Sequence, residues 1–384
     1  MLRYTLSMLA PYALRAEESR GRRYAEAGHA YRNDFQRDRD RVVHSRAFRR
    51  LENKTQVFTR RHSDHFRNRL THTIEVAQIS RTIAAELHLN EDLVEALALV
   101  HDVGHPPFGH AGERTLNAAM QEHGDYFDHN LHALRTVEQF EQRYADFPGL
   151  NLTFEVREGI VKHSRDYDAK EFPRLAEYLL DQRPPLEAQL IDFTDEIAYS
   201  TADLDDGVEA RILTREQVRR DVPVFARLYA EVERLYPAAA EKLKFNETLK
   251  RVLDHLVSDL IAHTRKKIAE AGVRRVEDVR EFPQRLCAFS PQVEEERRQL
   301  KDFLYQNLYF SSALQRDKQQ AEQVISEMFA FFMKSPQELP GSYQEKTRHE
   351  PLHRIVCDFL GGMTDTYILE QHRRFCPPKK RVGV

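Results

Sequence analysis

The chain has 384 residues, 41% of them hydrophobic and 31% charged, and a formal net charge of −3 at pH 7. This balance excludes a wholly basic nucleic-acid-binding protein, and the lack of an apolar run of about 20 residues excludes a bilayer-spanning helix. The opening segment shows no small-residue cleavage site and the three cysteines lie far apart, so we expect a cytoplasmic protein without a membrane partner or a disulfide framework.

Two arginine-rich segments come first along the chain, DRDRVVHSRAFRR (38–50) and TRRHSDHFRNRL (59–70). In the DRDR part of the first, the aspartates can pair with neighbouring arginines, so this part is either a solvated helix face with ion pairs or an anion site. The FRNRL part of the second segment has no acids of its own. It is therefore the better candidate for binding an anion.

The low glycine content, 14 residues in 384, favours long helices. The spacing predicts a helix over 70–87, in which His72 heads an otherwise apolar stripe. A second helix is expected to begin after Asn90, which is a suitable N-cap, and to carry His101 at the end of its apolar stripe. It should stop near Val103 because glycines and prolines follow.

A third helix is predicted over 189–207, with Gly207 as its expected end. Its buried stripe consists of Leu190, Phe193, Ile197, Thr201 and Leu204. Asp195, Tyr199 and Asp203 lie four residues apart on another face. That second face either meets water or lines a cavity.

The rest of the chain has the pattern of further amphipathic helices, with turns expected near Pro237, Pro283 and Pro336. No segment shows the period-two alternation of a strand over a useful length. The predicted fold class is therefore all-α. The basic tail, 377–384, is expected to be disordered.

The segment LALVHDVGHPPFGHAGE (97–113) places several titratable groups at the end of an apolar helix. A lone histidine on such a helix is usually a core residue, but His101 adjoins Asp102 and His72 heads another helical stripe. With Asp195 they form a possible set of two imidazoles and two carboxylates. Mixed nitrogen and oxygen ligands suit a divalent first-row transition metal, which can activate water near neutral pH.

Spacing alone does not single out Asp195, but the order of these residues resembles the H…HD…D signature of the HD-domain phosphohydrolases. Five ordered blocks are more specifically similar to bacterial deoxyguanosinetriphosphate triphosphohydrolases and their relatives: AFRRLENKTQVF, HFRNRLTHTIEVAQISR, LVHDVGHPPFGHAGE, FDHNLHALR and DFTDEIAYSTADLDDG. The similarity runs from about Arg20 to Tyr367. It implies an HD-domain helical core over 50–206, an N-terminal helical extension over 1–49 and a C-terminal helical lobe over 207–384.

The resemblance also implies roles for individual residues. The metal ligands it implies are His72, His101, Asp102 and Asp195. The catalytic residues it implies are His110, Glu113 and His129. The substrate-binding residues it implies are Gln56, Arg69, Lys162, Tyr199 and Asp203, of which Lys162 could equally be a surface lysine.

Enzymes of that family hydrolyse a dNTP in one step to the deoxynucleoside and tripolyphosphate, so the resemblance implies this reaction. The implied cofactor is a divalent metal ion, with Mn first and Mg, Fe, Co or Ni as alternatives. The implied assembly is a homo-oligomer, often a hexamer. A second nucleotide or single-stranded DNA is a possible effector.

The chemistry of the residues agrees with these roles. Expelling the nucleoside 5′ oxygen requires a proton, which His110 could supply, and Glu113 could orient the imidazole if the segment is helical. Arg69, with Arg67, would balance the charge of a triphosphate. Tyr199 could pack against C2′ of the sugar, while Gln56 and Asp203 could hydrogen-bond the 3′ hydroxyl.

Three points stay open at the level of the sequence. His105 either supports the metal or substrate site or only satisfies backbone groups of the turn. A different HD reaction, on an alarmone or a nucleoside monophosphate, is the rival enzymatic function. A nucleotide-sensing HD module without turnover is the rival from another class, and the base preference among dNTPs is not predicted.

Overall fold

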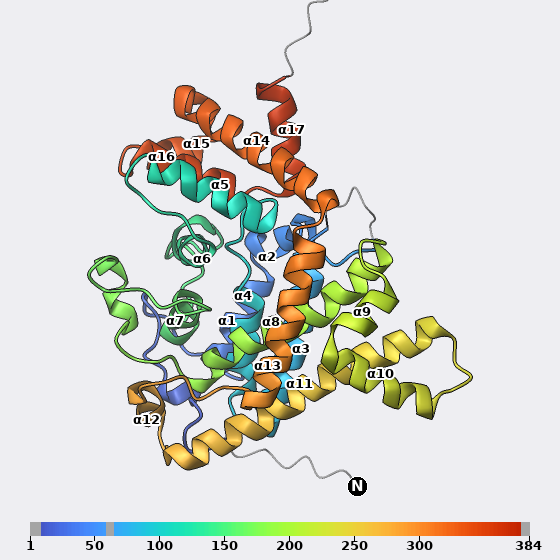
Figure 1. Cartoon of the computed structure of the whole chain (residues 1–384). Coiled ribbons are helices and arrows are strands. Elements are labelled where there is room, and N and C mark those ends of the chain that lie inside the picture. The colour runs from blue at the N-terminus through green and yellow to red at the C-terminus, as the bar shows by residue number, and fades with distance from the viewer. Residues whose placement is uncertain (1–8, 59–64, 378–384) are drawn as a thin grey trace, which may run out of the picture.

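The computed structural model describes residues 9–58 and 65–377. Over these residues the secondary structure is helical, with isolated β-bridges and no strand, so the all-α prediction is confirmed (Figure 1). No helix of the described residues is both long and apolar enough to cross a membrane. Residues 59–64 of the second arginine-rich segment and 378–384 of the predicted disordered tail lie outside the described residues.

The α-helices fall into an N-terminal and a C-terminal series. The first comprises α1 (Asp34–Val43), α2 (Arg46–Arg50), α3 (Arg69–Glu86), α4 (Glu91–Val100), α5 (Gly109–Gln121), α6 (His129–Arg135), α7 (Phe154–Val161) and α8 (Leu186–Glu209). The second comprises α9 (Arg215–Asp221), α10 (Pro223–Leu235), α11 (Glu241–Ala271), α12 (Val276–Glu281), α13 (Pro291–Leu304), α14 (Ser312–Lys334), α15 (Gly341–Lys346), α16 (Leu352–Gly361) and α17 (Asp365–Phe375). Short π-helical turns, η3 (Thr136–Phe140) and η5 (Tyr305–Tyr309), follow α6 and α13.

The end of α4 is set by capping and by close packing. Asn90 caps the helix as predicted, because its side chain accepts a hydrogen bond from the Leu93 N–H. The helix ends at Val100 and a turn follows. A Cβ on Gly104 would lie 2.0 Å from the His129 carbonyl oxygen, so glycine is needed for α6 to pack against this turn.

The prediction that Gly207 ends the third helix is wrong, because α8 continues to Glu209. A Cβ on Gly207 would lie 2.8 Å from a methyl carbon of Leu213, so this glycine makes room for a neighbouring side chain inside the helix. The chain instead adopts a left-handed conformation at Arg211, with φ of 58°. Of the stripe predicted to be buried, Leu190, Ile197, Thr201 and Leu204 are buried, whereas Phe193 is only partly buried.

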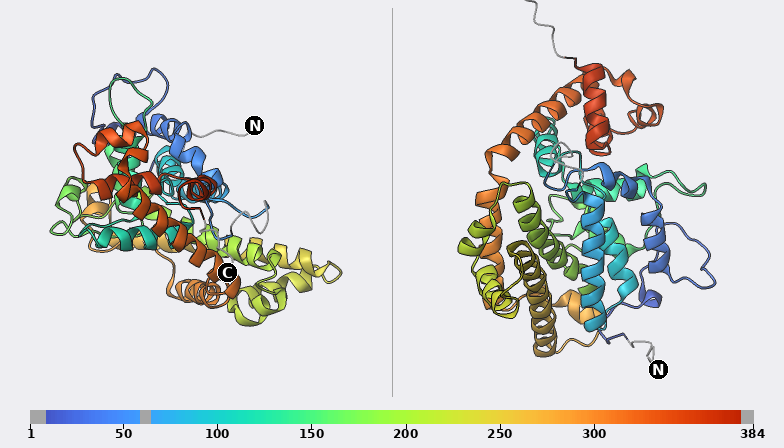
Figure 2. Two further views of the ribbon diagram at one scale, coloured as in Figure 1. Left: turned by 90° about the horizontal axis from the view of Figure 1, so that it is seen from above. Right: turned by 90° about the vertical axis from the view of Figure 1, so that its right-hand side faces the viewer.

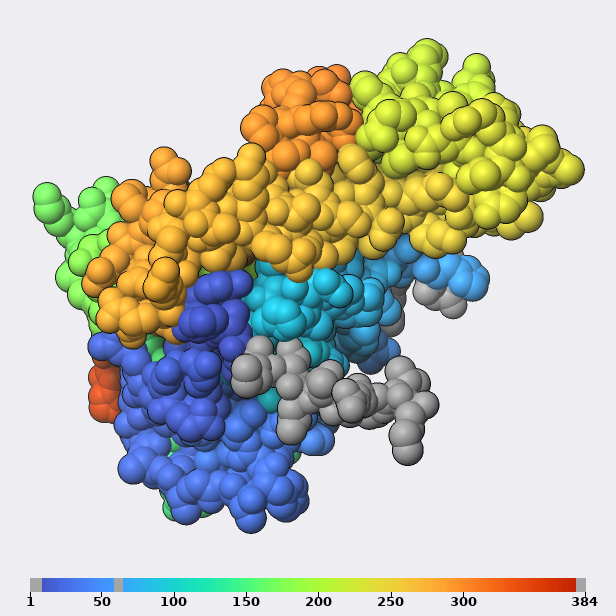
Figure 3. All heavy atoms as spheres, turned by 90° about the horizontal axis from the view of Figure 1, so that it is seen from below, coloured from blue at the N-terminus to red at the C-terminus, as the bar shows by residue number. Residues whose placement is uncertain are grey.

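The helices pack around two apolar clusters. The larger one is built largely from α3, α4, α8 and α11, and α11 forms a long ridge across one face of the molecule (Figure 3). The smaller one joins α5 to α14, α16 and α17, which lie at one end of the molecule while α11 lies toward the other (Figure 2). The boundaries 1–49, 50–206 and 207–384 stay a prediction.

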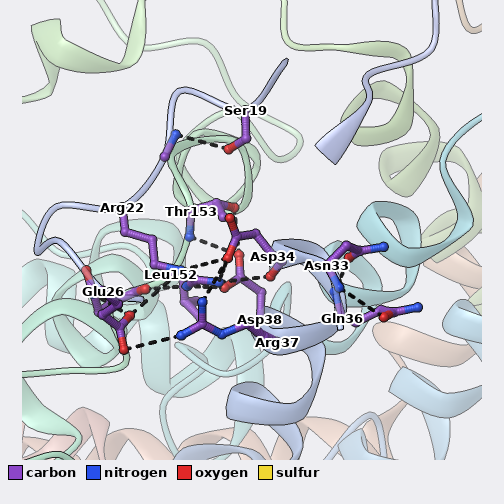
Figure 4. A network of polar contacts seen from close by, with 12 residues as sticks. Ser19, Arg22, Glu26, Asn33, Asp34, Gln36, Arg37, Asp38, Leu152 and Thr153 are labelled. Atoms are coloured by element: carbon purple, nitrogen blue, oxygen red, sulfur yellow. Dashed lines mark hydrogen bonds and ion pairs between the residues drawn. The ribbon is translucent and has the colours of Figure 1, made fainter. Parts of the chain in front are cut away.

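The arginines of the DRDR part of the first segment (38–41) form ion pairs, as the ion-pair interpretation of that part predicts. Arg39 lies 3.4 Å from Glu95 and Arg41 lies 2.6 Å from Glu26. The fully buried Asp38 pairs with Arg22 at 2.5 Å and accepts hydrogen bonds from the Thr153 N–H and hydroxyl at 2.9 and 2.6 Å (Figure 4). This network fastens the N-terminal segment to the start of α7.

The buried pair of Arg22 and Asp38 predicts a large loss of stability on Arg22→Leu. Removing the arginine leaves a buried carboxylate without its counter-ion, which costs about 3–5 kcal/mol. The free energy of unfolding in urea, followed by circular dichroism, measures this loss. Arg32→Leu is the control, because Arg32 pairs with Asp40 at a partly exposed site and should cost about 1 kcal/mol or less. Equal losses in the two variants would contradict the prediction.

Candidate active site

The four predicted metal ligands come together where α3, α4 and α8 meet. His72 lies in the first turn of α3, His101 caps the end of α4 with Asp102 next to it, and Asp195 lies on α8. His72 Nε2 is 2.8 Å from Asp195 Oδ1. His101 Nε2 is 3.5 Å from Asp102 Oδ1 and 3.9 Å from Asp195 Oδ1. Residues separated by up to 123 positions thus face one another.

The tautomer of His101 favours metal binding. Its Nδ1 lies 2.6 Å from the Ala98 carbonyl oxygen, which can only accept, so Nδ1 carries the proton and Nε2 keeps its lone pair. That Nε2 is buried and has no hydrogen-bond partner among the described residues. Ligand atoms of His72, His101 and Asp102 all lie within 4.8 Å of one another. The donor set therefore fits a divalent metal ion.

The protonation of the site also suits a cation. Burial lowers the pKa of His101 and keeps its ring neutral. Burial by itself would raise the pKa of Asp102, but Arg69, whose Nη1 lies 2.9 Å from Oδ2, and the nearby histidines hold it well below its usual range. Asp195 is half-buried, and although burial by itself would raise its pKa, the hydrogen bond and charge of His72 lower it. Both carboxylates are therefore anionic at neutral pH.

A second polar cluster contains the three predicted catalytic residues. Glu113 is at its centre, with Oε1 accepting the His129 N–H at 3.0 Å and lying 2.8 Å from His129 Nδ1. Its other oxygen is 3.3 Å from His110 Nδ1. Burial would raise the pKa of Glu113, but the hydrogen bonds of both histidines lower it far more. The segment carrying His110 and Glu113 is helical, as the proposed orientation requires.

His105 connects the two clusters. Its Nδ1 lies 2.9 Å from Asp102 Oδ1 and its ring stacks on that of His129, with centroids 4.0 Å apart. Burial, followed by the charges of Arg69 and His129, lowers its pKa well below the usual value. Of the two interpretations left open by the sequence, the contacts favour the supporting role, because the ring faces Asp102 and His129.

The start of α5 is held by a residue from the C-terminal part of the chain. Phe108 and Gly109 both have positive φ, 63° and 57°, where the chain turns into α5. The Phe108 N–H donates to Asp365 Oδ1 at 2.9 Å, and Asp365 Oδ2 accepts the Thr55 N–H at 2.9 Å. A Cβ on Gly109 would lie 3.1 Å from Arg69 Nη2, so the turn passes close to this guanidinium.

Two of the predicted substrate-binding residues keep unused polar atoms. Arg69 is buried beside Asp102, and its Nε has no hydrogen-bond partner among the described residues. The same holds for the buried Oε1 of Gln56. The backbone of Gln56 lies near Gly109, because a Cβ built on Gly109 would be 3.7 Å from the Gln56 carbonyl oxygen. Arg69 and Gln56 therefore lie on the same side of the α5 turn.

Two other basic residues are already engaged by protein groups. Arg67 lies 3.0 Å from Glu75 and 2.5 Å from Asp206, so the acids missing from its own segment come from α3 and α8. Lys162 donates to Glu158 at 2.8 Å and to two backbone carbonyls at 2.8 and 2.9 Å. These contacts use all three of its N–H groups. A phosphate role for Lys162 stays a prediction, and it would require these bonds to break.

Tyr199 and Asp203 follow Asp195 along one face of α8. Asp203 is buried, and burial raises its pKa to about 7 despite a hydrogen bond from the hydroxyl of Tyr309. Burial also raises the pKa of Tyr199, which keeps its phenol neutral. Tyr309 comes from η5, and no sequence pattern pointed to it. Asp203 can therefore act as acceptor or donor near neutral pH.

His163 is a residue of the site that the sequence analysis missed. Its Nδ1 lies 2.8 Å from Asp192 Oδ1 and its Nε2 lies 3.9 Å from Asp195 Oδ2. His101, His163 and Asp195 form a further group whose ligand atoms lie within 4.8 Å of one another. The sequence offered only a weak signal for His163, namely its place next to the candidate Lys162 and the place of its partner Asp192 three residues before Asp195.

The fold and the site define an HD-domain phosphohydrolase. Residues 69–200 match the family model of the HD domain, and residues 287–374 match that of the phosphohydrolase-associated domain. The first match contains all four predicted metal ligands. The protein is accordingly a hydrolase of phosphate compounds with a site for a divalent metal ion.

Similar proteins cover nearly the whole chain. Proteins called deoxyguanosinetriphosphate triphosphohydrolase-like are 48% identical over 366 residues in Thiobacillus denitrificans and 49% over 367 residues in Azoarcus sp., covering 95% of this chain and 96% of each relative. One from Ralstonia pickettii is 47% identical over 367 residues, 95% of this chain and 94% of the relative. The chain belongs to the deoxyguanosinetriphosphate triphosphohydrolase-like family.

The geometry predicts that His101→Ala loses the metal ion. The variant removes a buried imidazole nitrogen that keeps its lone pair and has no hydrogen-bond partner among the described residues, so affinity for Mn²⁺ should fall about 100-fold or more. Metal content after gel filtration and a Mn²⁺ titration measure this loss. His349→Ala is the matched control, because His349 is exposed near the end of α15. Metal binding equal to that of the unmodified chain would remove His101 from the ligand set.

Proposed function

We propose that the protein is a metal-dependent dNTP triphosphohydrolase, which converts a dNTP and water into the deoxynucleoside and tripolyphosphate. The observation that carries the proposal is the contact between the two clusters. A donor set for a divalent cation lies directly beside a histidine–glutamate group suited to proton transfer, with His105 between them. The name of the relatives makes dGTP the first substrate to test.

The leaving group needs a proton, and His110 is placed to supply it. When bound, a divalent ion would supply Lewis acidity to the α-phosphoryl group and the attacking water. His110 turns Nδ1 toward Glu113 and its ring is largely exposed, with 73% of the side chain accessible. Nε2 is therefore free to face the nucleoside 5′ oxygen. The anionic Glu113 stabilises the protonated imidazole and is shared with His129.

Arg69 is the principal phosphate-binding residue of the proposal. It has a buried guanidinium close to the α5 turn and keeps an unused N–H. Its contact with Asp102 fixes it next to the metal ligands. Arginine binds phosphate oxygens through several N–H groups at once, so this position suits the triphosphate of a nucleotide.

The face of α8 beyond Asp195 is the proposed sugar site. Tyr199 offers an aromatic wall for C2′, where a ribose hydroxyl would clash. Asp203 and Gln56 offer polar atoms for the 3′ hydroxyl, and the buried Oε1 of Gln56 has no partner among the described residues. Turnover of dGTP relative to GTP reports this selection directly.

The test of the proposed function is an incubation of the purified chain with Mn²⁺ and each of the four dNTPs and GTP. We expect a deoxynucleoside and tripolyphosphate from at least one dNTP, alone or with a second dNTP as effector, and no turnover of GTP. Anion-exchange chromatography separates the products. Release of pyrophosphate or orthophosphate, or turnover confined to an alarmone or a nucleoside monophosphate, would instead support the rival HD reaction.

His110→Ala should reduce kcat by about 10²–10⁴-fold, because the poor leaving group loses its acid. Metal content and nucleotide affinity should stay near those of the unmodified chain, since His110 is neither a predicted metal ligand nor a predicted substrate-binding residue. Single-turnover kinetics and equilibrium binding separate the two effects, with His349→Ala as control. A variant that keeps most of its kcat would assign the proton to another group.

The same proposal includes a cytoplasmic homo-oligomer, with a hexamer as the first assembly to test. A second nucleotide or single-stranded DNA is its proposed effector. Sedimentation velocity with and without dNTP tests the assembly. A monomer under both conditions would contradict this part and leave the proposed reaction untouched.

A further inference from the structure

A polar cavity of about 100 Å³ lies between α2, α6, α15 and α16, next to the turn that carries Asp102. It is lined by residues far apart in the sequence, from Arg46 to Gly362. Pockets that enclose a whole small-molecule ligand are about 300–1,000 Å³, so this cavity matches a single compact group. None of the residues given a catalytic or substrate-binding role above lines it.

Basic side chains dominate the lining. Arg46, Arg50, Lys54 and Lys346 all contribute to it. Their side chains contact backbone carbonyls and one ring: Arg50 donates to the Gly362 carbonyl at 2.8 Å, and Lys346 lies 4.8 Å from the ring centre of Phe140. None of the four forms an ion pair with a carboxylate of the described residues. Four basic groups thus share one cavity without an ion pair to any carboxylate within residues 9–58 and 65–377.

The acidic residues of the cavity are already engaged elsewhere. Asp358 is bound by the guanidinium of Arg135, with N–O distances of 3.0 and 2.6 Å. Glu141 accepts the backbone N–H groups of Arg46 and Ala47 at 3.1 and 2.7 Å. The carboxylate of Asp358 is neutralised by Arg135, so Glu141 alone balances part of the positive charge of the lining. Burial, with the charge of Arg50 as a second cause, lowers the pKa of Lys54 to about 7, although the charges of Asp365 and Asp102 act in the opposite direction.

Two hydrogen bonds connect the cavity to the catalytic turn. Lys54 Nζ donates to the His105 carbonyl at 2.5 Å, and His132 Nδ1 lies 2.8 Å from the Gly104 carbonyl oxygen. Both Lys54 and His132 line the cavity. An occupant would therefore lie next to the residues that hold the backbone directly after Asp102.

We propose that this cavity is a phosphate-binding site, in which Arg46, Arg50 and Lys346 bind a single phosphoryl group above Lys54. Guanidinium and ammonium groups together are the usual partners of such an oxyanion. The phosphoryl group belongs either to free phosphate or to a larger phosphorylated molecule whose remainder extends outward. The site is separate from the proposed triphosphate position at Arg69.

The test is a titration of the full-length, Mn²⁺-loaded chain with inorganic phosphate in a chloride buffer, by isothermal calorimetry. Arg46→Gln and Lys346→Gln remove charge from the cavity, whereas Lys266→Gln removes a lysine from an exposed position on α11. Arg69→Gln weakens anion binding at the active site. Thermal unfolding verifies that each variant is folded.

We expect phosphate affinity to fall by about tenfold or more in Arg46→Gln and in Lys346→Gln, and to be unchanged in Lys266→Gln. This phosphate binding should persist in Arg69→Gln. Affinity in the two cavity variants equal to that of the unmodified chain, or binding that disappears only with Arg69→Gln, would overturn the proposal. Neither result depends on whether a dNTP is hydrolysed.

Competition identifies the source of the phosphoryl group. If dGTP or tripolyphosphate displaces phosphate from the site that depends on Lys346, the group belongs to a larger molecule. If neither competes there while phosphate still binds, the ligand is free phosphate. Both outcomes support the site. Equal binding of chloride and phosphate would show nonspecific ion adsorption instead and would overturn the proposal.

Discussion

The abrupt end of α4 is the constraint on which the active site depends. His101 and Asp102 can face α3 and α8 together only because the helix stops at Val100 and the chain turns at once. Gly104 is essential to that turn, since any side chain there would overlap the backbone of α6 at His129. The same close approach brings His129 to Glu113. One glycine thus positions both the predicted metal ligands and the predicted proton-transfer group.

Charge balance explains why so many titratable groups can be buried in one place. Asp102 stays anionic because Arg69 and the surrounding histidines outweigh the cost of burial. His72 and Asp195 form a further pair, in which the carboxylate raises the pKa of the imidazole against the opposing effect of burial. Buried charge is tolerated when it is paired, and the remaining buried nitrogen of His101 is suited to a cation.

The C-terminal helices complete a site whose named motifs lie in the N-terminal half. Asp365 at the start of α17 anchors the turn into α5, and Tyr309 binds Asp203 on α8. The cavity with the four basic residues likewise needs α15 and α16 for its wall. The matched phosphohydrolase-associated domain, residues 287–374, contains Tyr309 and Asp365. The contacts of Tyr309 and Asp365 show how this segment, which has no ligand motif, supports the residues of the HD domain.

The sequence by itself determined the helical class and the start of α3 and α4, because helical spacing and capping depend on neighbours a few positions away. The two groups of candidate residues came from the family resemblance, and their roles stay a prediction. The sequence failed at Gly207 and at the acids that pair with Arg67, and it missed His163 and Tyr309. Those features come from contacts between α8 and distant segments. Only the tertiary structure could decide them, because pairing, burial and pKa depend on groups that approach through folding rather than through sequence order.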